Sequence, residues 1–215
     1  GESSPMMLHP EIESLDRGAL QALQMRKLAA LGERLAASPD WCHHFARAGM
    51  HPRDLAARDG LANAPTLEKS DLRTRYPFPL LTVDVSRVTR FFATSGTTGL
   101  PVLFGFTHKD LHQLLAVQVA RQLYCIGVRP GERAYQGYGY GLWIGGPAHE
   151  LGLEELGVTC FPVGPGRSEL VVQWLRDQAW DVATLSPLFL AHLIRVAREN
   201  GIEPKKDWVL RNAII

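Results

Sequence analysis

The fold of this chain is indicated most strongly by the stretch Ala93-Thr94-Ser95-Gly96-Thr97-Thr98-Gly99-Leu100-Pro101. This stretch is rich in glycine and in residues with hydroxyl side chains, and it comes directly after an apolar, strand-like run at residues 88–93. Glycine lets the backbone come close to a ligand, and its N–H groups can form a nest that binds an anion. Serine and threonine hydroxyls add donors that rotate toward an oxygen. The stretch predicts a polyphosphate-binding loop, with an ordinary polar turn as the alternative, because the same residue types dominate turns.

Two common nucleotide-binding loops are excluded by the residues themselves. A Walker A loop ends in Gly-Lys-Ser/Thr, whereas Gly99 is followed by Leu100. A dinucleotide fingerprint needs Gly-x-Gly-x-x-Gly. The second glycine-rich run, residues 137–146, fails this spacing because the last position falls on Leu142 or Ile144. A kinase or another phosphate-loop NTPase is therefore disfavoured.

From residue 88 onward, strand-like runs alternate with amphipathic helical runs. Strands are expected at residues 88–93, 102–106, 133–136, 158–163, 182–185 and 209–215, the first two forming a hairpin around the loop. Helices are expected at residues 107–126, 146–156, 168–178 and 187–199, with Thr107, Ser168 and Ser186 at their beginnings. This alternation predicts an α/β fold with a mostly parallel sheet flanked by helices.

The residues before this region favour helix. Residues 11–37 carry leucines near helical spacing among good helix formers, which predicts one long amphipathic helix or two in tandem. A short helix is expected at residues 41–48, and another is expected to be capped by Thr66 and to stop before Pro77. The chain is thus predicted to contain an N-terminal helical segment, residues 1–80, that packs on a main α/β domain, residues 81–215.

A second informative run is Tyr138-Gly139-Tyr140-Gly141-Leu142-Trp143. Glycines between aromatic residues let the backbone pass close to a flat ring, and Tyr138 and Trp143 can stack on such a ring. The run therefore predicts a pocket for an aromatic ligand. The alternative is a set of core aromatic residues beside a glycine bend.

Composition and charge are those of an ordinary globular protein. The 215 residues are 46% hydrophobic and 21% charged, with a formal net charge of +1. This charge gives no reason to expect a nucleic acid or an acidic membrane surface as partner, and no apolar run is long enough to span a membrane. The three cysteines form no Cys-x-x-Cys pair, which favours a reducing cytoplasm. The apolar residues Ala213, Ile214 and Ile215 of the last expected strand predict an open sheet edge and self-association, for instance as a homodimer.

Several histidines invite a functional interpretation that their spacing does not support. Adjacent side chains of a helix point apart, so His43 and His44 are not expected to share a metal. His108 and His112 share a helix face, but no third ligand is evident nearby. A structural or helix-start role is expected for His149. No metal site is predicted.

Four segments together resemble the phenylacetate–CoA ligase family of the adenylate-forming (acyl-CoA synthetase) superfamily. They are residues 72–78, 90–99, 127–132 and 138–143. The last is the most specific, because it is similar to the family's Tyr-Gly-Tyr-Gly-Leu-Phe signature, with Trp143 in place of Phe. The likeness runs from about Ile12 to the last residue and covers the N-terminal half of a family member.

The resemblance implies an AMP-binding-type domain, incomplete at its C-terminus, from an ATP-dependent ligase. Such an enzyme activates an aromatic carboxylic acid as an acyl adenylate and transfers it to coenzyme A, with ATP, Mg²⁺ and coenzyme A as cofactors. The implied nucleotide-binding residues are Thr94, Ser95, Gly96, Thr97, Thr98 and Gly99. The implied acid-binding residues are Tyr138, Gly139, Tyr140, Gly141 and Trp143.

Two features of the chain argue against full activity. The family's adenine loop, metal-side Glu, ribose Asp and catalytic Lys would all follow Ile215, so no catalytic residue is assigned and the chain alone is expected to be inactive. The family has Lys where Leu100 stands, and other adenylate-forming enzymes often have Lys where Val102 stands. Loss of a charge-assisted contact would weaken phosphate binding by about 1.5–3 kcal/mol. The alternative function is a truncated, non-catalytic paralogue or interaction module that keeps the fold and the acid pocket.

Overall fold

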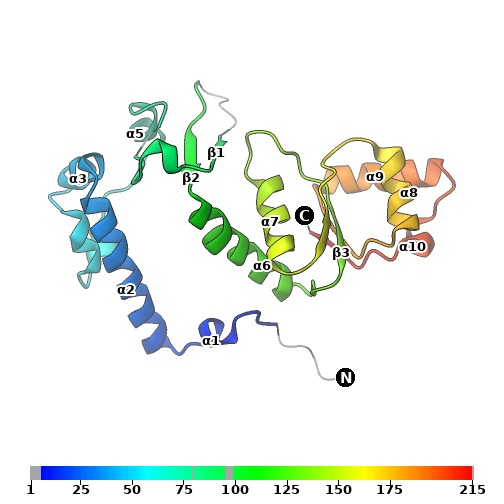
Figure 1. Cartoon of the computed structure of the whole chain (residues 1–215), viewed down its shortest axis with the longest axis horizontal. Helices are drawn as coiled ribbons and strands as arrows, with labels where there is room; N and C mark the ends of the chain where they lie inside the picture. Colours follow the sequence, from blue (N-terminus) through cyan, green and yellow to red (C-terminus); the bar gives the residue numbers. More distant parts are fainter. Residues whose placement is uncertain (1–5, 79, 95–98, 215) are drawn as a thin grey trace. The chain divides into compact units, whose positions relative to one another are not determined.

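The computed structural model describes residues 6–78, 80–94 and 99–214 (Figure 1). The chain divides into two compact units. One unit comprises His9–Thr107, and the other runs from His108 to the C-terminal end and includes the residues before His9. The division expected near residue 80 stays a prediction.

The unit His9–Thr107 is mainly helical before its hairpin. Its helices are α1 (Pro10–Glu13), α2 (Arg17–Ala36), α3 (Pro39–Ala46), α4 (Gly60–Asn63) and α5 (Lys69–Arg73), with short 3₁₀ turns η1 (Pro52–Ala56) and η2 (Val85–Arg87). The helical run expected at residues 11–37 is two helices because Asp16 caps α2, its carboxylate accepting the Ala19 N–H at 2.9 Å. Leu35, Phe45 and Leu55 form the buried core between α2, α3 and η1.

The prediction that Thr66 caps the next helix is wrong. Helix α5 begins after Glu68, where a capping box joins Glu68 and Asp71. The Asp71 carboxylate accepts the Glu68 N–H at 2.9 Å. A pair of reciprocal bonds satisfies two orphan N–H groups at once, which one threonine further upstream cannot do.

The hairpin expected around the loop is confirmed. Strand β1 (Arg90–Ala93) pairs antiparallel with β2 (Leu103–Phe106), with Arg90 opposite Phe106 and Ala93 opposite Leu103. The rings of Phe92 and Phe106 meet edge to face with centroids 5.3 Å apart. The hairpin therefore places Thr94 and residues 99–102 at one of its ends.

The second unit contains a four-stranded parallel sheet in the order β4-β3-β5-β6, which confirms the predicted fold class (Figure 1). Its strands are β3 (Arg133–Gln136), β4 (Thr159–Phe161), β5 (Val182–Thr184) and β6 (Asn212–Ile214). Its helices are α6 (Ala116–Cys125), entered through a π-helical turn η3 (Asp110–Leu115), α7 (Gly145–Glu155), α8 (Ser168–Asp177), α9 (Pro187–Glu199) and α10 (Pro204–Asp207). None of the described helices is long and apolar enough to cross a membrane.

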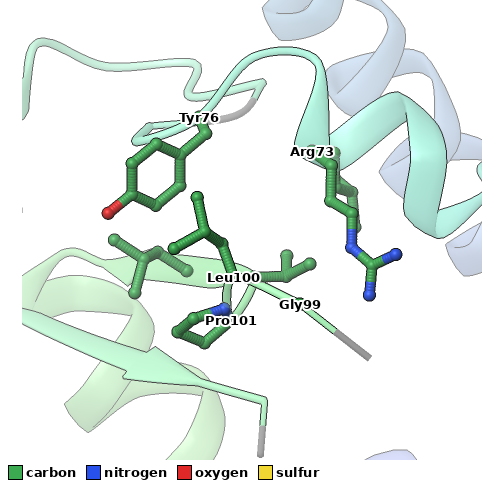
Figure 2. Close-up of a pocket in the computed structure, with 8 residues that line it drawn as sticks. Arg73, Tyr76, Gly99, Leu100 and Pro101 are labelled. Carbon is green, nitrogen blue, oxygen red and sulfur yellow. The ribbon is translucent and has the colours of Figure 1, made fainter. Parts of the chain in front are cut away.

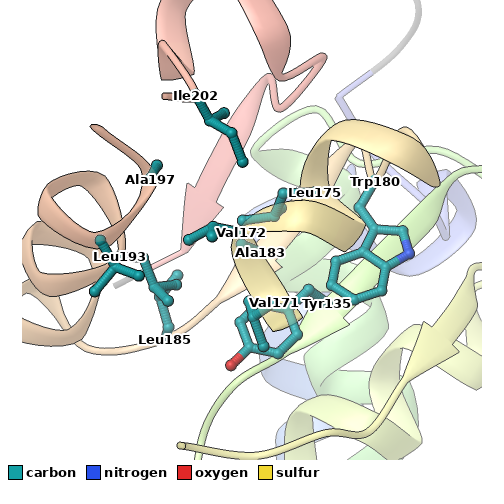
Figure 3. Close-up of a cluster of buried hydrophobic side chains, with 11 residues drawn as sticks. Tyr135, Val171, Val172, Leu175, Trp180, Ala183, Leu185, Leu193, Ala197 and Ile202 are labelled. Carbon is teal, nitrogen blue, oxygen red and sulfur yellow. The ribbon is translucent and has the colours of Figure 1, made fainter. Parts of the chain in front are cut away.

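Two hydrophobic clusters cover the two faces of this sheet. Ala134 and Val182 pack with residues of α6 and α7, whereas their neighbours Tyr135 and Ala183 pack with residues of α8 and α9 (Figure 3). Successive residues of a strand point to opposite faces, so the helices form a layer on each side. The central strands β3, from Ala134 onward, and β5 are consequently buried on both faces, as in other parallel sheets.

Ser186 and Ser168 were both predicted to begin helices of this unit, with different outcomes. Ser186 caps α9 as expected, its hydroxyl accepting the Phe189 N–H at 3.3 Å. The prediction that Ser168 caps α8 is wrong, because Arg167 stands at the cap position in a left-handed conformation. The Ser168 hydroxyl is instead 2.9 Å from Nε2 of His192 on α9.

Candidate functional site

The ends of the expected phosphate loop are held together by threonine. The Thr94 N–H donates to the Val102 carbonyl, and the Val102 N–H donates to the Thr94 hydroxyl, both at 3.1 Å. Thr94 therefore closes the base of the loop with its backbone and its side chain together. Ser95, Gly96, Thr97 and Thr98 lie outside the described residues.

Gly99 is the described end of the loop, and its backbone requires glycine. Its φ of +139° is a conformation that side chains with a Cβ rarely adopt. A cavity of about 190 Å³ lies beside it, lined by Leu72, Arg73, Tyr76 and residues 99–103 (Figure 2). Arg73 of α5 supplies a guanidinium to this wall, a positive group that the sequence reasoning did not single out.

The two positions that lack lysine differ in their surroundings. Val102 is 4% exposed and belongs to the buried hydrophobic residues, whereas Leu100 is 61% exposed. Figure 2 shows the Leu100 side chain directed toward the ring of Tyr76. Leu100 thus contributes an apolar wall to the cavity where the family has lysine. Val102 packs in the hydrophobic core at the other position.

The aromatic run follows β3, at the carboxyl end of the parallel sheet, and a buried glutamine braces it. Gln136 Oε1 accepts the Tyr138 N–H at 2.6 Å, and Gln136 Nε2 donates to the Tyr138 carbonyl at 3.1 Å. The Thr184 hydroxyl of β5 donates to the same Oε1 at 3.3 Å. Gln136 has no exposed surface. One amide therefore holds both sides of the Tyr138 backbone, a contact that the sequence reasoning missed.

Tyr138, Trp143 and His149 form an aromatic cluster. Tyr138 and Trp143 meet edge to face with centroids 5.4 Å apart, and His149 of α7 lies against Tyr138 at 5.0 Å with a 32° tilt. Burial raises the pKa of the Tyr138 hydroxyl, which stays neutral near pH 7. Trp143 is 55% exposed. The cluster therefore combines an anchored tyrosine with an accessible indole.

A groove of about 450 Å³ runs along the same end of the sheet. It is lined by Gly137, Tyr138, Gly139, Pro165, Ser186, Leu188, Phe189 and His192. In open parallel sheets, ligands bind outside the carboxyl ends of the strands. The groove follows this rule because its walls come from the segments after β3, β4 and β5.

The other residues of the run have different surroundings. Desolvation raises the pKa of the Tyr140 hydroxyl, which also interacts with the polar side chains of Gln136 and Glu150. Tyr140 is therefore grouped with these polar side chains and not with the aromatic cluster. The Gly139 carbonyl packs against Gly146, where an added Cβ would overlap with it. An added Cβ at Gly141 would meet no atom within 4 Å.

No group of three or more His, Cys, Asp or Glu within the described ranges gathers to hold a metal ion. The rings of His108 and His112 lie close, with centroids 4.2 Å apart. Cys42, Cys125 and Cys160 are free.

This fold is that of the N-terminal part of a CoA ligase. The chain aligns with 2-hydroxyisobutyryl-CoA ligase in complex with 2-HIB-AMP and CoA, with a TM-score of 0.88 and 26% identity over 99% of this chain and 46% of that chain. An open conformation of the same ligase gives a TM-score of 0.87, 25% identity and 51% of that chain.

The likeness to phenylacetate–CoA ligases is confirmed by curated relatives of that name. The chain is 37% identical to the Thermus thermophilus enzyme over 94% of this chain and 45% of that protein. It is 34% identical to the Pseudomonas putida enzyme over 94% of this chain and 47% of that protein. The chain therefore spans about half the length of the curated relatives it matches. No protein-family model matches it.

Proposed function

We propose that this chain is the acid- and phosphate-binding half of an ATP-dependent aryl acid–CoA ligase. The observation that carries the proposal is the pair of Tyr138 and Trp143, set edge to face at the carboxyl end of a parallel sheet. Tyrosine and indole rings suit a flat aromatic group packed against their accessible surfaces. An aromatic carboxylic acid, such as a phenylacetate, is thus the proposed substrate.

Nucleotide binding is proposed for Thr94, Gly99 and the residues between them. Thr94 joins the two strands at the base of the loop, and Gly99 has a φ of +139° with open space where a Cβ would stand. Arg73 lines the cavity beside Gly99 and brings a positive charge to a wall where Leu100 and Val102 bring none. Arginine suits phosphate because its planar fork donates two parallel hydrogen bonds.

The proposed reaction needs little covalent work from side chains. ATP supplies the α-phosphorus that the carboxylate of the acid attacks, with pyrophosphate leaving, and coenzyme A then accepts the acyl group. The residues of the chain would orient the ring and the phosphates, since positioning and charge stabilisation dominate such transfers. Mg²⁺ is expected to arrive with the nucleotide, because the described residues gather no set of ligands for it. We further propose a cytoplasmic location and a homodimer.

The test is acid-dependent exchange of labelled pyrophosphate into ATP, measured with the 215-residue chain and with the full-length product of its gene. Exchange is expected only with the full-length product, and more with phenylacetate or benzoate analogues than with a fatty acid. Trp143→Phe should alter the preference among aryl acids, whereas Trp174→Phe, on α8 and packed against its hydrophobic cluster, should not.

Two results would contradict the proposal. A preference for the fatty acid would contradict the aromatic pocket. An absence of exchange in the full-length product, with acid binding retained, would support the alternative of a non-catalytic paralogue.

A further inference from the structure

The aromatic cluster contains a histidine, His149, whose two ring nitrogens have different surroundings. His149 Nδ1 lies 2.8 Å from the Gly145 carbonyl oxygen, one turn earlier on α7. A carbonyl oxygen can only accept, so Nδ1 donates this hydrogen bond, and in that tautomer the lone pair is on Nε2. Within the described residues no hydrogen bond is made by Nε2. His149 therefore offers an acceptor.

The His149 ring lies against Tyr138, which lines the groove at the carboxyl end of the sheet. Its centroid is 5.0 Å from that of Tyr138, which in turn lies 5.4 Å from Trp143. The next residue, Glu150, acts on the Tyr140 hydroxyl instead. His149 is thus the polar member of the cluster formed by Tyr138, Trp143 and His149.

We propose that His149 is a specificity-determining residue, which selects an aryl acid whose ring carries a hydrogen-bond donor, such as a phenolic hydroxyl. The inference rests on the proposed function and names the class of acid. The unprotonated Nε2 does not favour the carboxylate of the acid, because both groups are acceptors. A hydroxyl on the ring of the acid can donate a hydrogen bond to Nε2 of His149. The bond between Nδ1 and the Gly145 carbonyl holds the imidazole in the orientation that accepts it.

The alternative role of His149 is packing alone. Substitutions at this position distinguish packing from the selection of the acid. His149→Phe keeps a ring against Tyr138 and removes Nε2. His149→Gln keeps a side-chain acceptor without the ring. His112→Phe is the matched control, because it makes the same exchange on a different, exposed helix segment.

Calorimetric titrations of the purified chain would use phenylacetate, its three monohydroxy derivatives and the matching methoxy derivatives, which have no donor. At least one hydroxy acid is expected to bind about three- to tenfold more tightly than phenylacetate and its methoxy counterpart, the range of one net hydrogen bond. His149→Phe should abolish this difference and leave phenylacetate binding within about twofold, His149→Gln should retain part of it, and His112→Phe should change nothing.

The outcomes separate the two proposals. Equal binding of all the acids, or an equal loss for all of them in His149→Phe, would contradict the role of His149 and leave the proposed function standing. A hydroxyl preference that survives His149→Phe would also contradict it. Binding of none of the aryl acids would contradict the proposed function itself, and the inference with it.

Discussion

Gln136 is a side chain on which the position of the aromatic run depends. Its amide is fully buried, bonds the backbone of Tyr138 through both its nitrogen and its oxygen, and accepts from Thr184. A buried amide with good partners rigidifies its surroundings, whereas the same partners left unpaired cost free energy. The geometry of the proposed acid site is therefore set by a residue behind it.

Gln136→Leu should lower the free energy of unfolding by about 1–3 kcal/mol, because the Tyr138 N–H and carbonyl lose their buried partners. Urea unfolding followed by circular dichroism measures this. Thr184→Val is the milder comparison, since it removes only the bond at 3.3 Å. Equal stability of Gln136→Leu and the parent chain would show that the amide does not brace the turn.

Cys160 illustrates how burial controls reactivity in this sheet. Burial, followed by the carboxylates of Glu150 and Glu154, raises the pKa of the Cys160 thiol to about 12. At pH 8 only about one thiol in 10,000 is then ionised, and the thiolate is the nucleophile. Because the folded state holds the proton more tightly than the unfolded chain, this thiol lowers stability as the pH rises from about 8.5 toward 12.

Alkylation with iodoacetamide at pH 8, followed by peptide mass spectrometry, is expected to label exposed Cys125 first. Cys160, which is half-buried, should react much more slowly until denaturant is added. Labelling of both thiols at the same rate in the native chain would contradict the protected position of Cys160.

At the scale of elements, helix α7 packs closely against the turn after β3 because a glycine lies at the point of contact. The first turn of α7 contains Gly146, and a Cβ there would overlap with the Gly139 carbonyl and approach the Tyr138 carbonyl. Both are backbone groups, which cannot move aside as a flexible side chain can. The close approach keeps the aromatic run against the start of the helix.

Gly146→Ala should therefore destabilise the chain by about 1–3 kcal/mol, as overpacking in a filled interior does, although alanine is the better helix former. Gly141→Ala is the matched control, because its added Cβ meets no atom within 4 Å, and it should change stability little. Thermal unfolding of both variants makes the comparison. A Gly146→Ala chain as stable as Gly141→Ala would contradict the close packing.

At the scale of the whole molecule, the sheet has an edge at β6. Strand β6 pairs with β5 on one side, and no other described strand lies beyond it. Unpaired backbone groups of an edge strand can pair with another chain. The exposed Ala213 lies in the middle of this edge.

The isolated chain should thus associate as its concentration rises, which sedimentation velocity would detect. Ala213→Lys should reduce the association, because edge lysines oppose strand pairing. A chain that stays monomeric at every concentration, or association unchanged by Ala213→Lys, would show that β6 is not the surface involved.

Local sequence was enough to predict the strands and the longer helices after residue 88, their order and the family resemblance. The alternation of strand and helix after residue 88 predicted the parallel sheet, and the hairpin followed from two apolar runs around a glycine-rich loop. Ser186 was predicted correctly as a cap because the bond joins neighbours in the sequence. The residues Ser95–Thr98 of the predicted nucleotide site lie outside the described chain, and their role stays a prediction.

Only the tertiary structure decided which side chains meet across elements. Gln136 and Thr184 lie on different strands, and Ser168 and His192 on different helices. Hydrophobic periodicity identifies the buried face of an element, but it carries no information about the polar partner that a neighbouring element brings. For the same reason, the contact of His149 with Tyr138 and the requirement for glycine at Gly146 appeared only when α7 was packed against the turn after β3.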